Sequence, residues 1–361
     1  MRRQTHTGLF FLLLTLLLLA PIRTAAQIQS NSTYGPLPVF ELHSGFWINL
    51  HHTLYQEARQ RNTATSPDKS ARSSAAATKN TPEVKLTLTA TEQKAWGDAV
   101  AYYAANYATK DLLFSTELIQ LKDQLGDFED CDELSGRKRK FCDAGLSAKL
   151  TQVLEAAAPV YRAHLWQEHD RANRRWIQRV APLVREQGVG LSERLADIYQ
   201  TRWPREKIRV EVAGYANWAG AYTTVDPLRV TISSLDSRNQ GAEALEVLFH
   251  EASHGIAEPV QAAIIRECHQ RDKAIPRDLW HALVFYTTGE VIRPVLSSPA
   301  ATAGNQDGSV PGGGYTPYAL REGLYQRGWN EYLKVLQRFW QPYLDGRASF
   351  DDAIARMVSS L

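Results

Sequence analysis

The sequence lacks an excess of charge of either sign. Lysine and arginine number 41 and aspartate and glutamate 39 among 361 residues, which gives a formal net charge of +2. Proteins that bind nucleic acid carry a basic patch that neutralises phosphates. We therefore expect no nucleic-acid partner. Because 44% of the residues are hydrophobic, the chain has enough apolar sequence to build one large or two medium domains.

Long hydrophobic runs are also scarce. The apolar stretch from Gly8 to Ile22 follows Arg2 and Arg3 and precedes the small residues Thr24-Ala25-Ala26, a pattern typical of a secretory signal peptide. Its apolar core is shorter than the roughly 20 residues that cross a bilayer. We expect residues 1–26 to be removed, a secreted or periplasmic mature protein, and no stable membrane span after cleavage.

Cysteine is rare as well. The chain has three cysteines, and Cys131 and Cys142 flank a charged, turn-prone segment, so in an oxidising compartment they are suited to close a short disulfide loop. Two unpaired thiols are the alternative. Cys268 has no evident partner.

Hydrophobic periodicity divides the chain near residue 204. Trp47, Leu50 and Leu54 recur at helical spacing, and helical patterns fill 91–125 and 141–187, whereas 63–82 has the composition of a flexible linker. Residues 27–204 are thus expected to be mainly helical. Alternating or β-branched runs at 208–212, 221–225 and 229–232 predict a small sheet, and helical periodicity resumes near Gly241. The fold class expected is α+β and mostly helical.

The helical run from Ala242 to Ala257 contains His250-Glu251-Ala252-Ser253-His254, the pattern H-E-x-x-H. Residues four apart lie on one face of a helix, so both imidazoles can reach a single zinc ion. Glu251 is rotated about 100° from His250 and can act on a water molecule. The alternative is a helix with two ordinary histidines.

This motif resembles that of the zincin metallopeptidases, over about Ile208 to Pro294. The resemblance implies a zincin-like catalytic domain at 205–361, one zinc ion, a peptide or protein substrate, and Glu251 as general base. It also implies that substrate pairs with an edge strand near Gly220-Ala221-Tyr222-Thr223-Thr224. The segment begins like the G-A-M-E-N strand of zinc aminopeptidases but lacks its glutamate, so aminopeptidase activity is not supported.

A third protein ligand is needed to leave one zinc position for water. Metzincins continue with a glycine and a third histidine where this chain has Ala257 and Val260, so that subclass is excluded. Gluzincins take a glutamate from a following helix, which favours Glu290 within 278–292. The competitors are His281, Glu258 and Glu267. His281 and Glu290 are nine residues apart, about 180° around the helix, so only one of them can face the metal. An ion pair with Arg293 or Arg277 is the alternative role for Glu290.

Tyr315 and Tyr318, near the glycine-rich loop between Ser297 and Pro317, are candidate hydrogen-bond donors to an oxyanion. Ordinary packing is their alternative role. The sequence thus predicts an exported zinc metallopeptidase with His250, His254 and Glu290 on the metal. The competing hypothesis is a non-catalytic exported binding or scaffold protein that keeps a degenerate peptidase fold. The sequence does not indicate an oligomeric state.

Overall fold

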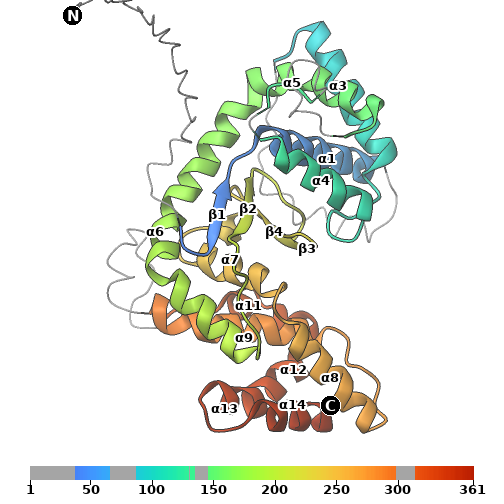
Figure 1. The fold of residues 1–361 in the computed structure, drawn as a ribbon. Helices are drawn as coiled ribbons and strands as arrows, with labels where there is room; N and C mark the ends of the chain where they lie inside the picture. Colours follow the sequence, from blue (N-terminus) through green and yellow to red (C-terminus); the bar gives the residue numbers. More distant parts are fainter. Residues whose placement is uncertain (1–36, 66–86, 130, 135–144, 298–313) are drawn as a thin grey trace, which may run out of the picture. The chain divides into compact units, whose positions relative to one another are not determined.

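The fold consists of a four-stranded sheet with helices on both faces (Figure 1). The computed structural model describes residues 37–65, 87–129, 131–134, 145–297 and 314–361. Among these residues no helix has both the length and the hydrophobicity to cross a membrane. The N-terminal helices are α1 (Phe46–Thr65), α3 (Ala90–Asn106), α4 (Thr116–Asp127), α5 (Ala148–Tyr161), the π-helical turn η1 (Arg162–Trp166) and α6 (Gln167–Ile198).

The sheet contains β1 (Phe40–His43), β2 (Ile208–Ala213), β4 (Leu228–Ser233) and β3 (Ala221–Val225), in the order β1-β2-β4-β3. β1 and β4 lie parallel to β2, and β3 lies antiparallel to β4. The three predicted strands are confirmed, and β1 was not predicted. Because β1 precedes all the N-terminal helices, the sheet is assembled from both sides of the expected boundary at residue 204. The described residues from Leu37 to Leu361 belong to one compact unit.

The two faces of the sheet differ in chemistry, because residues that are paired across strands share a face and successive residues alternate. Phe40, Val210, Val212, Val230 and Ile232 lie on one face and are buried. This face packs against α7 (Glu243–Ser253), where Phe249 makes an edge-to-face contact with Phe40 at 5.2 Å. The apolar face therefore holds the helix that carries the H-E-x-x-H motif.

The opposite face of the sheet is polar and is nevertheless buried under α1 and α4. Glu211, Thr224 and Thr231 lie on it and are each at most 4% exposed. Lys122 of α4, itself 1% exposed, donates a hydrogen bond to the hydroxyl of Thr224 at 2.5 Å. The N-terminal helices are thus joined to the sheet through polar contacts as well as through their hydrophobic core.

Asn49 links three elements at this junction. Its amide nitrogen donates to the backbone oxygens of Gly45 and Val212, and its oxygen accepts from Asn173 of α6 and from the backbone N–H of Gly214. The side chain is 1% exposed, so all four bonds are shielded from water. Asn49 therefore ties α1 to β2 and to α6.

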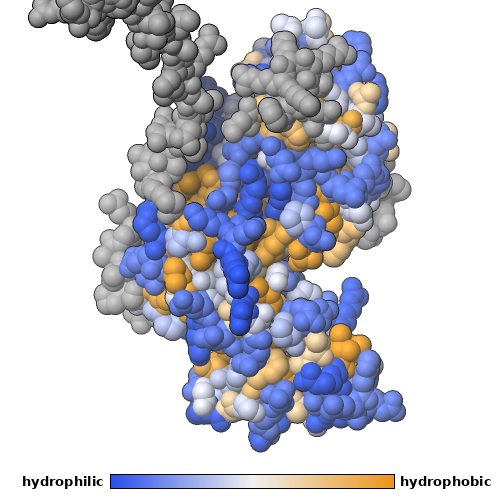
Figure 2. All heavy atoms as spheres, viewed as in Figure 1, coloured by the Kyte–Doolittle hydropathy of each residue, from blue (hydrophilic) through white to orange (hydrophobic). Residues whose placement is uncertain are grey.

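The C-terminal helices lie below α7 in the view of Figure 1. α9 (Leu279–Leu296) packs directly on α7, and the remaining elements pack around α9 and α8. On the face seen in Figure 2, hydrophilic residues predominate and hydrophobic residues lie in several small groups among them. The other elements of this half are η2 (Ser237–Asn239), α8 (Glu258–Gln270), α11 (Tyr318–Arg321), η3 (Tyr325–Trp329), α12 (Asn330–Val335), η4 (Leu336–Trp340), α13 (Gln341–Leu344) and α14 (Phe350–Ser360).

Candidate metal centre

The H-E-x-x-H segment lies at the C-terminal end of α7. Glu243 and Glu246 occupy the first turn, where acidic side chains favour a helix start. The helix ends at Ser253, and His254 caps it. Gly255 follows, and a side-chain carbon at this position would lie 2.5 Å from the side chain of Leu228. The glycine thus lets the β3–β4 turn approach the end of α7 directly beside the second histidine.

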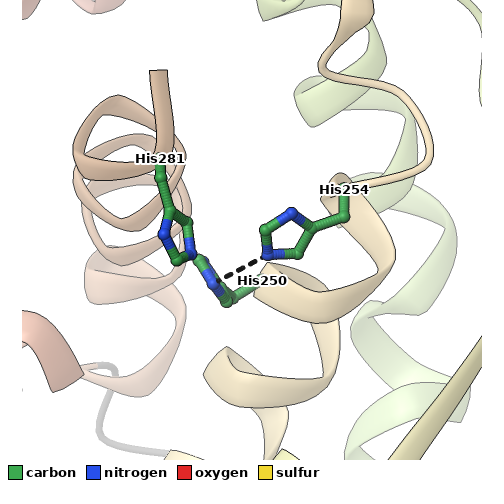
Figure 3. Close-up of side chains that lie close together, drawn as sticks. All are labelled: His250, His254 and His281. Atoms are coloured by element: carbon green, nitrogen blue, oxygen red, sulfur yellow. Dashed lines mark hydrogen bonds between the residues drawn. The ribbon is translucent and has the colours of Figure 1, made fainter. Parts of the chain in front are cut away.

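His250 and His254 point toward one another from consecutive turns, as Figure 3 shows. Their Nε2 atoms are 3.3 Å apart. Two imidazole nitrogens on one tetrahedral zinc, each at 2.0–2.1 Å, would be separated by about 3.4 Å. The spacing of this pair therefore fits a shared zinc ion.

The third member of the group is His281, on the first turn of α9 (Figure 3). One ligand atom from each of His250, His254 and His281 can be chosen so that all three lie within 4.8 Å of one another. The His281 ring centre is 5.4 Å from that of His250 and 5.0 Å from that of His254. Three histidines with one position left for water is a known catalytic zinc arrangement.

Glu290, the third ligand expected from the sequence, does not belong to the group of three histidines. Its carboxylate accepts a hydrogen bond from Arg293 at 2.6 Å, in the ion pair that was its alternative role. Nine residues separate His281 from Glu290, which places them on opposite sides of α9, and it is His281 that joins the other two imidazoles. Of the other competitors, Glu258 is exposed at the start of α8, and Glu267 pairs with Arg271.

Burial keeps the three imidazoles uncharged. It lowers the pKa of His254 to about 3 and that of His281 to about 4, and it also lowers the pKa of His250. The neighbouring histidines lower the pKa of His250 and His254 further. A metal ion binds the neutral form of histidine. The group therefore presents free lone pairs at neutral pH.

Glu251 is 8% exposed and is held by the edge strand of the sheet. The hydroxyl of Thr223, on β3, lies 2.7 Å from its Oε2 atom and 2.8 Å from its backbone oxygen. Burial raises the pKa of Glu251 to about 7, and the Thr223 hydrogen bond opposes this rise. A nearby cation, like the Thr223 hydrogen bond, would lower this pKa and favour the carboxylate form. This is a suitable pKa range for a general base.

Aromatic rings surround the three imidazoles, and the sequence did not single them out. Phe285 stacks on His250 with ring centres 3.6 Å apart. The Trp280 ring contacts the rings of His254 and His281. The centre of the Trp329 ring lies 5.5 Å from that of His281. A cavity of about 410 Å³, lined by residues 326–332, has Trp329 in its wall. The spacing of His281 and Phe285, four residues apart on one helix face, was the only sequence signal of this shell.

The two tyrosines proposed as oxyanion donors have other contacts. The hydroxyl of Tyr315 donates to Glu246 at 2.7 Å, one helical turn before His250. Tyr318 is 7% exposed, and its ring stacks on Phe285 with centres 6.1 Å apart. These contacts support the packing alternative for both residues.

Several predictions cannot be compared with the described residues. Residues 1–26, most of the 63–82 linker and Cys142 lie outside them, so the signal peptide and the Cys131–Cys142 disulfide stay predictions. Cys268 is a buried free thiol.

Comparisons with protein-family models, with curated protein sequences and with solved structures found no match to this chain. Functional inference therefore depends on the geometry and chemistry of the site.

Proposed function

We propose that this protein is an exported zinc-dependent hydrolase, a metallopeptidase with His250, His254 and His281 as metal ligands. The observation that carries the proposal is the grouping of three neutral imidazoles on two packed helices, with the buried Glu251, whose pKa is raised to about 7, directly after His250 in the chain. A cluster of uncharged nitrogen donors suits zinc. The adjacent Glu251 supplies the proton acceptor that hydrolysis requires.

The chain contributes binding and proton transfer. Zinc in such a site polarises a carbonyl group and lowers the pKa of a water molecule toward about 7. Glu251 accepts the proton of the attacking water and returns it to the leaving amine, and Thr223 fixes the orientation of its carboxylate. Since β3 is the edge strand next to α7, an extended peptide can pair with it, as the resemblance to zincins implies.

The decisive experiment compares zinc content and hydrolysis in wild type and in Glu251→Gln. The variant keeps the shape of the side chain but removes the proton acceptor. We expect zinc to remain stoichiometric, while cleavage of a responsive member of a peptide library falls by at least about 10²–10⁴-fold. Equal rates would refute the role of Glu251. Zinc binding without any cleavage by wild type would favour the binding or scaffold hypothesis.

Export is a separate part of the proposal. Mass spectrometry of the protein recovered outside the cytoplasm should find an N-terminus near Gln27, because the small residues before it suit signal-peptide cleavage. An intact Met1 in that pool would contradict export with cleavage.

A further inference from the structure

Nε2 of the His250 ring lies 3.3 Å from Nε2 of His254, but no hydrogen bond among the described residues holds the other side of the ring. Its Nδ1 atom is buried and has no hydrogen-bond partner among the residues that the structure describes. Metal-binding histidines usually donate their second ring N–H to a carboxylate, a carbonyl or a water molecule, which fixes the ring. Another interaction must therefore orient this imidazole.

A series of stacked rings supplies that interaction. Phe285 of α9 lies on the His250 ring at 3.6 Å with an angle of 17° between the planes. Tyr318, at the start of α11, continues the series on Phe285 at 6.1 Å with an angle of 9°. Offset stacking of this kind is favourable and directional. The three near-parallel rings come from three different elements.

Glu246 holds Tyr318 in place from α7. Its carboxylate is 1% exposed and accepts the backbone N–H of Tyr318 at 2.9 and 3.0 Å, besides the hydroxyl of Tyr315. Glu246 and His250 are four residues apart, on one face of the helix. The same helix thus carries the metal ligand and the anchor of the last ring.

The segment 314–318 is also held by α9. A side-chain carbon at Gly289 would lie 2.6 Å from Cβ of Pro317, so only glycine allows this approach. The hydroxyl of Ser297 accepts the backbone N–H of Tyr315 at 2.9 Å. The segment is therefore fixed on both helices that carry the three histidines.

We propose that the stack of Tyr318, Phe285 and His250 orients the His250 imidazole for the metal, with Glu246 holding Tyr318 in place. The stack takes the role of the hydrogen bond that the second ring nitrogen of a metal-binding histidine usually donates. Phe285, Tyr318 and Glu246 are then positioning residues. The inference rests on the metal site of the proposed function. It predicts that removal of a ring weakens metal binding even though neither ring touches the metal.

The test uses Phe285→Leu and Tyr318→Leu, which remove one ring each, and Tyr318→Phe, which keeps it. Tyr343→Leu is the matched control, because the Tyr343 ring of α13 contacts the Trp340 ring at 4.8 Å, tilted by 51°, and takes no part in the stack on His250. Zinc affinity is measured by chelator competition, and the ligand field is measured from the visible spectrum of the cobalt-substituted protein. The thermal stability of each metal-free variant is recorded beside them.

We expect both ring-removing variants to bind zinc about 10- to 100-fold more weakly, as changes around metal ligands typically do, with an altered cobalt spectrum. Tyr318→Phe and Tyr343→Leu should match wild type in both properties, even where Tyr343→Leu lowers stability. Wild-type affinity and an unchanged spectrum in Phe285→Leu and Tyr318→Leu would overturn the inference alone. Absence of zinc binding by wild type would overturn it together with the proposed metal site.

Discussion

At the residue scale, the proposed metal site depends on which residue of α9 is the third ligand. His281 and Glu290 are on the same helix, but only His281 joins the other two imidazoles. His281→Ala should therefore lose most bound zinc and the stability that zinc confers, since metal binds the native state. Glu290→Gln should keep both, because its partner is Arg293. Metal analysis and melting temperature with and without zinc check the pair. Zinc loss in Glu290→Gln together with retention in His281→Ala would reverse the assignment.

Thr223 offers a second test at the same scale. Its hydroxyl lies at hydrogen-bond distance from the Glu251 carboxylate, and a hydrogen bond to a charged group is worth about 1.5–3 kcal/mol. Thr223→Val should bind zinc normally but hydrolyse peptide about tenfold or more slowly, whereas Thr223→Ser should recover most of the rate. The rates of both variants on one responsive peptide, with zinc content measured in parallel, provide the check. A rate in Thr223→Val equal to that of wild type would remove Thr223 from the mechanism.

At the scale of elements, the stability contributed by the contact between Glu246 of α7 and the segment 314–318 should depend on pH. Burial raises the pKa of Glu246 to about 7, opposed by its hydrogen bonds from Tyr315 and Tyr318 and by Arg321, while Glu243 adds to the rise. Because the pKa of Glu246 is higher in the folded than in the unfolded protein, protonation of its carboxyl stabilises the fold. This contribution to the free energy of unfolding is complete below about pH 4.5 and is lost as the pH rises through about 7.

Glu246→Gln removes this titration, so the difference in melting temperature between the variant and wild type should shift in favour of the variant as pH rises from about 4.5 to about 7. The shift corresponds to at most about 3 kcal/mol. The comparison is made on metal-free protein, so that every other titrating group cancels between the two. A difference that stays constant over this range would contradict the raised pKa.

The sequence predicts most of the helices and strands, but it does not reveal the first strand of the sheet or the aromatic rings around the three histidines. The strands near 208–212, 221–225 and 229–232 were recognisable because β-branched runs alternate there. β1 was missed because its four residues place Glu41 and His43 on the polar face of the sheet, a pattern that looks like an exposed segment. Stacking of Phe285 and Tyr318 depends on contacts between distant segments, which periodicity cannot reveal. For the third ligand, the nine-residue spacing left two faces of one helix, and periodicity does not show that the face with His281 packs toward the other two histidines.

For the whole molecule, the N-terminal helices and the half that contains the three histidines should unfold together. The segment before α1 supplies β1, and the chain after α6 supplies the other three strands of the same sheet. Asn49 also joins α1 to β2 and α6. In Asn49→Ala the buried groups that pair with this side chain lose their partners, and each unsatisfied group costs about 1–3 kcal/mol. Calorimetry of metal-free wild type should therefore show one two-state transition, and the variant should shift that whole transition downward by several degrees.

Zinc provides the complementary perturbation. The first proposed ligand, His250, lies 52 residues after Ile198, where the last N-terminal helix ends, yet zinc should raise the same single transition. Asn106→Ala is the matched control. Among the described residues this exposed side chain bonds only to the backbone of Tyr102 within α3, so the variant should leave the transition nearly unchanged. Two transitions, with Asn49→Ala lowering one and zinc raising the other, would mean that the two halves are independent. A shared transition instead makes the N-terminal helices part of the scaffold on which the three histidines are held.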